Sequence, residues 1–413
     1  MTHIAWLGKK SPFCGNVTYG LTTTHALRQR NHLVSFIHFD TPAATLTRPF
    51  GEAADRSAQR AAGTRAALSD SEARQEVTLP YLVRSQVYTI PSPGAQRELR
   101  ESLERLKPDV VHASLTLSPL DFRLPDLCQQ LSLPLVATFH PPFDAGLRNL
   151  TAGTQQLSYQ LYAPSLARFD RVIVFSGLQA DVLRRLGVPE QRLSVIPNGV
   201  DTDLWQPPPL TESGNGQSSQ ELAELRERFH GRRVFLYMGR VATEKNLEAL
   251  LKAWRLVRPS GCVLVVVGDG PLRAPLQQAV EEEADVVWWG FEPRLEMRVA
   301  FQQLAEVFLL PSLVEGLSLA LLEAMAAGTA CVATDAGADG EVLGGGAGIV
   351  ISTQGVTTQL RTLLPVLRDQ PLLTAELGRR ARQRALERYT LSGSIDALEA
   401  LYAELVPRRS VAV

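Results

Sequence analysis

Two carboxylates flank a short segment in the last third of the chain, where Glu315 precedes Gly316, Leu317 and Ser318 and Glu323 follows. Ser318 is a residue type that caps helices well, so a helix is expected to begin after it and to carry Glu323. The amides of Gly316, Leu317 and Ser318 would then be unpaired donors at the positive end of that helix, suited to phosphate oxygens or hydroxyls. A ligand with an anionic centre and hydroxyls on both sides, such as a sugar nucleotide, fits this arrangement. A solvated loop glutamate and a surface helix glutamate are the alternative interpretation.

The elements that would position these residues alternate along the whole chain. Short apolar runs separated by helical stretches predict an α/β fold with parallel, doubly wound sheets. The expected strands are 2–7, 33–39, 110–113, 135–138, 172–175, 234–238, 262–267, 286–288, 307–310, 330–333 and 348–351. The expected helices include one that ends near residue 30 and others at 96–106, 178–186 and 391–405. Residues 42–76 show no clear period and are expected to form an excursion or loop.

Turn and linker residues cluster at 197–216, between the two runs of strands. We therefore expect two Rossmann-like domains, one over residues 1–197 and one over 198–387, with a final helix at about 388–413 packing back on the first. Two such domains place a ligand cleft between them, at the carboxyl ends of their strands.

The composition excludes several classes of protein. The 413 residues are 45% hydrophobic and 21% charged, which is an ordinary globular balance. The four cysteines are too widely spaced for a zinc site or a disulfide framework. The net charge of −1 makes nucleic acid an unexpected partner. The amino-terminal sequence lacks the pattern of a signal peptide, so we expect a cytoplasmic protein.

The segment from Glu315 to Glu323 resembles the Glu-x7-Glu signature of glycosyltransferase family 4, retaining enzymes of the GT-B architecture. Other matches occur in family order along nearly the whole chain. They are Val195–Asp201, Gly239-Arg240 followed by Glu244-Lys245-Asn246, Gly268–Pro271 and Gly290-Phe291.

This resemblance implies that the carboxyl-terminal domain binds a nucleotide-sugar donor and the amino-terminal domain binds the acceptor. It assigns Arg240 and Lys245 to the diphosphate, where charge-assisted hydrogen bonds of ~1.5–3 kcal/mol each would stabilise the leaving group. It assigns Glu315 to the hexose hydroxyls and Glu323 to the ribose, with the backbone around Phe291–Arg294 near the base. An exposed basic pair near a helix start is the alternative for the two cations.

The amino-terminal domain supplies three further expectations. Family members often carry two adjacent glycines near the phosphates, where this chain has Gly15 and Asn16. Asn adopts left-handed backbone more readily than most residues, so we expect the turn to be kept. His140 follows an apolar strand, where the family has a histidine near the hexose, and we expect it to bond a sugar hydroxyl. Lys9 and Lys10 are expected at the solvated rim, with a position in the cleft as the alternative.

No metal or other cofactor is expected. Asp201-Thr202-Asp203 has the D-x-D form of a metal motif, but it follows the interdomain turn and lacks the context of the architecture that uses that motif. Arg240 and Lys245 supply positive charge instead. No side chain is an obvious covalent nucleophile, so the resemblance implies that the acceptor hydroxyl attacks the face that the diphosphate leaves.

The donor is expected to be a UDP-hexose, from family frequency. Residues 1–200 hold 21 Lys and Arg against 16 Asp and Glu, while the remainder holds 21 against 27. With Arg48, Arg56, Arg60 and Arg65, this balance suits an anionic lipid surface and favours a membrane glycolipid acceptor, such as a diacylglycerol glycoside. A soluble sugar, a sugar phosphate or a polysaccharide is the alternative acceptor. A nucleotide-sugar epimerase and a non-catalytic nucleotide-sugar-binding protein are the alternatives from other classes.

Overall fold

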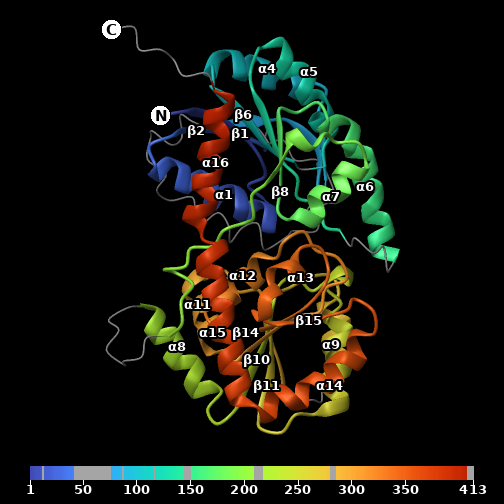
Figure 1. Cartoon of the computed structure of the whole chain (residues 1–413), viewed down its shortest axis with the longest axis vertical. Helices are drawn as coiled ribbons and strands as arrows, with labels where there is room; N and C mark the ends of the chain where they lie inside the picture. Colours follow the sequence, from blue (N-terminus) through green and yellow to red (C-terminus); the bar gives the residue numbers. More distant parts are fainter. Residues whose placement is uncertain are drawn as a thin grey trace, which may run out of the picture.

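The structure, a computed structural model, describes residues 1–11, 14–40, 76–85, 88–115, 117–143, 150–208, 217–279 and 285–406. Over these residues it confirms the α/β class. Two parallel sheets lie one above the other along the long axis, each flanked by helices (Figure 1). Among the described residues we find no helix with the length and apolar character that a membrane span needs.

The first sheet has seven described strands in the order β3-β2-β1-β6-β7-β8-β9, all parallel. Its strands are β1 (His3–Leu7), β2 (Leu33–Phe39), β3 (Glu76–Leu79), β6 (Val110–Ser114), β7 (Leu135–Thr138), β8 (Arg171–Val174) and β9 (Leu193–Val195). Its helices are α1 (Gly15–Gln29), α4 (Ala95–Leu106), α5 (Leu124–Gln130), α6 (Leu150–Leu166) and α7 (Gly177–Arg185). A separate antiparallel hairpin consists of β4 (Tyr81–Arg84) and β5 (Thr89–Pro91).

The second sheet has six described strands in the order β12-β11-β10-β13-β14-β15, also all parallel. They are β10 (Arg233–Met238), β11 (Cys262–Val267), β12 (Val286–Gly290), β13 (Val307–Leu310), β14 (Ala330–Thr334) and β15 (Ile349–Ile351). The accompanying helices are α8 (Gln217–Arg228), α9 (Leu247–Val257), α10 (Arg273–Ala279), α11 (Leu295–Leu304), α12 (Leu319–Ala326), α13 (Asp339–Val342), α14 (Val356–Asp369) and α15 (Pro371–Arg388).

The expected strands are present, with ends within two residues of those expected, because strands buried on both faces of a parallel sheet are continuous apolar runs. Every residue of β11 is buried, for example. The short strands β3, β4, β5 and β9 were not expected. Most of the segment 42–76, including Arg48, Arg56, Arg60 and Arg65, lies outside the described residues, although Glu76 begins β3.

Each sheet reverses its strand order at one place, and ligands of such folds bind beside that reversal, at the carboxyl ends of the strands. In the first sheet β1 lies between β2 and β6. In the second, β10 lies between β11 and β13. The loops that follow β1, β10 and β13 are therefore the positions at which the fold favours a ligand.

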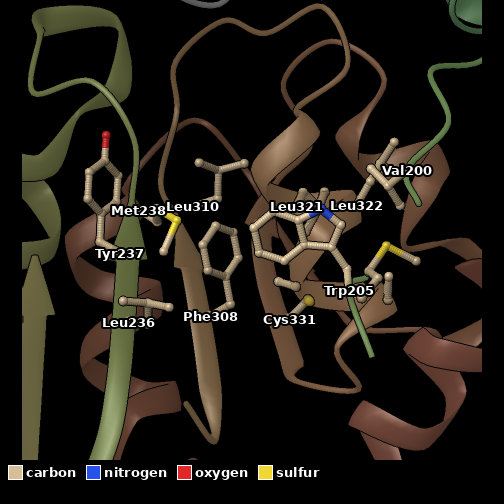
Figure 2. Close-up of a cluster of buried hydrophobic side chains, with 14 of the residues drawn as sticks. Val200, Trp205, Leu236, Tyr237, Met238, Phe308, Leu310, Leu321, Leu322 and Cys331 are labelled. Carbon is tan, nitrogen blue, oxygen red and sulfur yellow. The ribbon is translucent and has the colours of Figure 1, made fainter. Parts of the chain in front are cut away.

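The last helix, α16 (Leu391–Leu405), returns to the first sheet and lies beside α1 (Figure 1). Arg30 at the end of α1 forms ion pairs with Asp396 and Glu399 of α16. The chain that joins the two sheets is anchored by Val200 and Trp205, which are buried in the core of the second sheet together with α12 (Figure 2). The domain boundary at 197–198 stays a prediction, since the described strands place it only between β9 and β10.

Candidate active site

The loops after β10 and β13 bring the predicted donor-binding residues together. Lys245, on the 3-10 turn Thr243–Lys245, forms an ion pair with Glu315, which lies 70 positions further along the chain. The Ser312 hydroxyl donates to the same carboxylate at 3.0 Å. The side chains of Lys245 and Glu315 are only 19% and 10% exposed. This pair is therefore well shielded from solvent, and its charges act in a medium of lower dielectric constant than bulk water.

Backbone contacts hold the Glu315 loop from two sides. Gly337 has a φ of +56°, and a Cβ there would lie 2.0 Å from the Glu315 carbonyl oxygen, so only glycine allows this approach. The Ala338 amide donates to the Gly316 carbonyl at 2.9 Å. From the first domain, the Phe143 amide donates to the Glu315 carbonyl at 2.8 Å. The position of Glu315 is thus fixed by its own backbone as well as by Lys245.

The start of α12 matches the expected cap, but one of the three expected free amides is occupied. The Ser318 hydroxyl accepts from the Leu321 amide at 3.3 Å, as a helix cap should. The Ser318 amide itself donates to Asp339 Oδ1 at 3.0 Å, so the expectation that it faces a ligand is wrong. The amides of Gly316 and Leu317 find no acceptor among the described residues. They remain the two donors suited to an anionic oxygen.

Asp339 is a part of this site that sequence reasoning missed. It is fully buried, and its second oxygen has no hydrogen-bond partner in the part of the chain that the structure describes. Burial, followed by the negative charge of Glu315, raises its pKa well above the ordinary value and favours the neutral form. Its position just after β14, at the carboxyl edge of the same sheet, is the signal that would have pointed to it.

Arg240 follows β10 and forms an ion pair with Glu244 one turn later. The Tyr237 hydroxyl donates to the Arg240 carbonyl at 2.6 Å and fixes the backbone there. The Arg240 side chain is 38% exposed, so its guanidinium is far less shielded than the ammonium of Lys245. A bound diphosphate would compete with Glu244 for this cation.

The Gly-Asp-Gly motif after β11 has a packing role. Gly268 has a φ of +144°, and a Cβ there would lie 1.8 Å from the carbonyl oxygen of Gly239. A Cβ at Gly270 would lie 2.2 Å from the carbonyl oxygen of Val241. Any side chain at either position would push away the backbone that carries Arg240. These glycines therefore let two loops approach closely at the point where the ligand is expected.

Glu323 is buried on α12, and burial raises its pKa to about 7, against a smaller opposing effect of Arg298. Its carboxylate makes no hydrogen bond to another described residue, which is costly for a buried carboxylate unless a ligand supplies donors. Phe291, after β12, is 54% exposed, unusual for so large an apolar ring. Both features suit a nucleoside, through ribose hydroxyls on the carboxylate and a base on the ring.

In the first domain, α1 begins at Gly15, and neither Gly15 nor Asn16 has a positive φ. The expectation that Asn16 preserves a left-handed turn is therefore wrong, because the helix simply starts there. A Cβ at Gly15 would meet no atom of the described residues within 4 Å.

His140 follows β7 and is half-buried against two aromatic rings, Tyr19 and Phe175, whose centroids lie 5.0 and 5.2 Å from its own. Its Nε2 lies 2.8 Å from the Ser114 hydroxyl. Burial, followed by the nearby charge of Lys9, lowers the pKa of His140 to about 3, so the ring is neutral at physiological pH. A neutral, oriented imidazole suits hydrogen bonding to a sugar hydroxyl.

The two halves of the site are in contact. A Cβ at Gly316 would lie 3.2 Å from the His140 carbonyl oxygen, and the Asn198 side chain donates to the Leu317 carbonyl at 3.3 Å. The structure thus places His140 beside the loop that carries Glu315.

Three other predicted positions have local roles. The expectation of a solvated rim is wrong for Lys9, which is 5% exposed, whereas Lys10 forms an ion pair with Glu76. In the D-x-D sequence, Asp201 Oδ1 accepts from the amides of Asp203 and Leu204 at 3.0 and 3.1 Å, so it caps a turn. No cluster of three or more His, Cys, Asp or Glu side chains suited to a metal occurs in the described part of the chain.

Comparisons with known protein families identify both halves of the chain. A family model described as Glycosyltransferase Family 4 matches residues 15–204, and one described as Glycosyl transferases group 1 matches residues 232–369. Alpha-maltose-1-phosphate synthase of Mycolicibacterium smegmatis is 29% identical over 297 residues, 68% of this chain and 75% of that protein. The lipopolysaccharide core biosynthesis mannosyltransferase LpcC of Rhizobium leguminosarum is 28% identical over 250 residues, 58% of this chain and 66% of that protein.

Among solved structures, Anabaena HepE in complex with UDP and glucose superposes with a TM-score of 0.74 and 16% identity, over 98% of this chain and 100% of that one. This likeness extends over both sheets and confirms the GT-B fold. The chain belongs to glycosyltransferase family 4 and is a glycosyltransferase of the GT-B fold.

Proposed function

We propose that this enzyme transfers a hexose from a UDP-sugar to the hydroxyl of a membrane glycolipid, with retention of anomeric configuration and without a metal ion. The observation that carries the donor side is the shielded Lys245–Glu315 pair beside the amides of Gly316 and Leu317, for which the described residues offer no acceptor. A cation, a carboxylate and two backbone donors at one helix end match a sugar diphosphate, which is anionic in the centre and carries hydroxyls on the hexose side.

In this proposal Glu315 accepts hydrogen bonds from the hexose, and Lys245 and Arg240 bind the diphosphate. As the bond from the anomeric carbon to the diphosphate breaks, negative charge grows on the leaving oxygen, and the cations stabilise it most in the transition state. The acceptor hydroxyl forms the new bond on the same face. Its proton passes to a phosphate oxygen of the departing UDP.

The choice of UDP is supported by HepE, whose structure contains UDP and glucose. Glu323 supports a ribonucleotide in general, because a buried carboxylate without a hydrogen-bond partner among the described residues is matched by vicinal ribose hydroxyls. Metal independence is supported by Arg240 and Lys245, because their positive charges would neutralise the diphosphate in place of a metal ion.

The lipid acceptor is supported by apolar side chains exposed in the first domain. On α6, a helix without a charged residue, Leu157 and Leu161 are 64% and 63% exposed. On the β4–β5 hairpin Leu82 is 64% exposed, and Val83, Tyr88 and Ile90 are also exposed. Exposed apolar groups of this kind insert at a membrane interface. A relative, LpcC, is named as a mannosyltransferase of lipopolysaccharide core biosynthesis.

A sugar phosphate is the second candidate acceptor. The relative from Mycolicibacterium smegmatis is named as a maltose-1-phosphate synthase, and the match to it is longer than the match to LpcC. In that case the exposed leucines of α6 would have no part in acceptor binding.

The test is UDP release from UDP-glucose with anionic liposomes that carry diacylglycerol and its monoglycoside, compared with glucose 1-phosphate in solution. The lipid proposal predicts that liposomes raise the rate and that Leu157→Ser/Leu161→Ser abolishes only this increase. Leu372→Ser, at a leucine 86% exposed on α15, is the matched control and should change nothing. If glucose 1-phosphate raises UDP release and liposomes do not, the acceptor is a sugar phosphate and the lipid proposal is wrong. Chelator should leave the rate unchanged, and a loss restored by added metal would contradict metal independence.

A further inference from the structure

A chain of hydrogen bonds runs behind His140 and ends on the protein backbone. His140 Nε2 lies 2.8 Å from the Ser114 hydroxyl, and that hydroxyl lies 2.8 Å from Asn16 Oδ1. The Asn16 amide nitrogen donates to the Leu115 carbonyl at 3.1 Å. The three side chains come from α1, the end of β6 and the loop after β7, so the fold itself brings them together.

The direction of each hydrogen bond in this chain is determined by its backbone end. A carbonyl oxygen only accepts, so the Asn16 amide must turn its nitrogen toward Leu115 and its oxygen toward Ser114. The Ser114 hydroxyl has one proton, and it must donate that proton to the Asn16 oxygen. Ser114 can then only accept from His140, which requires the proton of the imidazole to be on Nε2.

The other ring nitrogen follows from this assignment. The ring is neutral, because burial and the charge of Lys9 lower the pKa of His140 to about 3. A neutral imidazole has one N–H, so Nδ1 carries a lone pair and can only accept. No described residue forms a hydrogen bond with Nδ1, and the ring is half-buried beside the Gly316 loop.

We propose that Asn16 and Ser114 are positioning residues that lock His140 in its Nε2–H tautomer, so that Nδ1 accepts a hydrogen bond from a hydroxyl of the transferred sugar. Tyr19 and Phe175 pack against the ring and against each other, and the relay sets which nitrogen bears the proton. This inference rests on the proposed function for the identity of the hydroxyl, but the tautomer itself does not depend on it. The relay also gives the asparagine at position 16 a role that a glycine could not fill.

The tautomer can be observed directly in the full-length protein. In protein labelled with ¹⁵N-histidine, long-range ¹H–¹⁵N correlations at pH 7 distinguish Nε2–H from Nδ1–H imidazole, and His140→Gln identifies the resonance of His140 among the seven histidines. We expect a pure Nε2–H tautomer in the wild type. Asn16→Ala frees the Ser114 proton to donate to the ring, and Ser114→Ala removes the acceptor, so both should yield a mixture of tautomers. Ser114→Thr keeps the hydroxyl and should restore the wild-type pattern.

The kinetic counterpart uses UDP-glucose and its deoxy analogues. Loss of one neutral hydrogen bond should lower kcat/KM by about tenfold in Asn16→Ala and Ser114→Ala. The inhibition constant of UDP, which has no hexose, should stay unchanged in Ser114→Ala. The deoxy analogue that lacks the hydroxyl bonded by Nδ1 should have a lower kcat/KM than UDP-glucose in the wild type. In these two variants its kcat/KM should equal that of UDP-glucose, which would identify the hydroxyl.

Two results would overturn the proposal. The first is an Nδ1–H tautomer of His140 in the wild type, and the second is an Nε2–H tautomer that persists in both Asn16→Ala and Ser114→Ala. If the tautomer shifts as expected but no nucleotide-sugar is turned over, the relay stands and the proposed function fails. If UDP-glucose is turned over and the tautomer does not shift, the proposed function stands and the relay fails.

Discussion

Replacing Lys245 by alanine is the sharpest perturbation of the donor site. The ammonium is 19% exposed and pairs with Glu315, so the variant removes one positive charge from a shielded position. A charge-assisted hydrogen bond of this kind is worth ~1.5–3 kcal/mol. At ~1.36 kcal/mol per factor of ten, kcat/KM for the donor should fall about 10- to 150-fold. Because charge on the diphosphate grows in the transition state, most of the loss should be in kcat.

The assay is steady-state UDP release, with Lys252→Ala as the matched control because Lys252 is exposed on the neighbouring helix α9. That variant changes the net charge equally and should retain wild-type kinetics. Lys245 and Glu315 are in contact, so their effects should not add: the double variant Lys245→Ala/Glu315→Gln should lose less than the product of the two single losses. Thermal unfolding checks that each variant is folded. Wild-type kcat/KM in a folded Lys245→Ala protein would refute the assignment of the diphosphate to this cation.

Three further outcomes follow from the same contacts. Burial raises the pKa of Glu323 to about 7, so about half of the unliganded protein carries a proton there at pH 7. Because ribose hydroxyls would donate to the ionised carboxylate, UDP binding should release ~0.5 proton at pH 7 and none at pH 9. Calorimetry in two buffers measures this release. Uptake of a proton, or release that persists in Glu323→Gln, would contradict this. Burial lowers the pKa of His112 to about 3 against 6.5 in the unfolded chain, so the unfolded state binds more protons between these values and acid destabilises the fold. The wild type should lose ~2 kcal/mol more of its free energy of unfolding than His112→Asn between pH 7 and pH 5 in urea titrations, and equal losses would refute the cause. A Cβ at Gly199 would lie 2.4 Å from the Thr390 carbonyl oxygen, so Gly199→Ala should destabilise by ~1–3 kcal/mol, whereas Gly153→Ala on α6, with open space around it, should be neutral or stabilising. Equal melting temperatures of these two variants would count against the contact.

Much of the fold could be predicted because its strands are buried on both faces. A run such as Cys262–Val267 contains only apolar residues, so its composition alone indicates a central parallel strand. The short strands β3 and β9 could not be predicted because each lies at an edge of the sheet and has at most four residues. So few residues at an edge leave no clear pattern in the sequence.

The donor half of the site could be predicted because its residues cluster in sequence near glycines with a packing requirement. Gly268 and Gly270 of the Gly-Asp-Gly motif allow backbone approaches that no other residue permits. What could not be predicted depends on the register between strands. Ser114 is paired with Thr138 across β6 and β7, and only this pairing brings its hydroxyl to His140. Asp339 reaches the Ser318 amide by a similar route between β13 and β14.

Burial of charge was the other feature that the sequence did not indicate. Lys9 and Lys10 are adjacent, yet Lys9 is buried and Lys10 is paired with Glu76 on β3. The lysine pair therefore offers no solvated basic patch for a lipid surface. The arginines that suggested such a patch, at positions 48, 56, 60 and 65, lie outside the described residues, so support for the lipid acceptor comes from Leu157 and Leu161 instead.

The central claim is that the Lys245–Glu315 pair binds the diphosphate sugar from which a hexose is transferred. The most direct measurement is nucleoside diphosphate release from UDP-, GDP- and ADP-hexoses by the wild type, Lys245→Ala and Lys252→Ala, each with liposomal and soluble acceptors. We predict acceptor-dependent release from UDP-hexose that falls at least tenfold in Lys245→Ala and is unchanged in Lys252→Ala. Absence of release from every donor, or equal release by all three proteins, would contradict the claim.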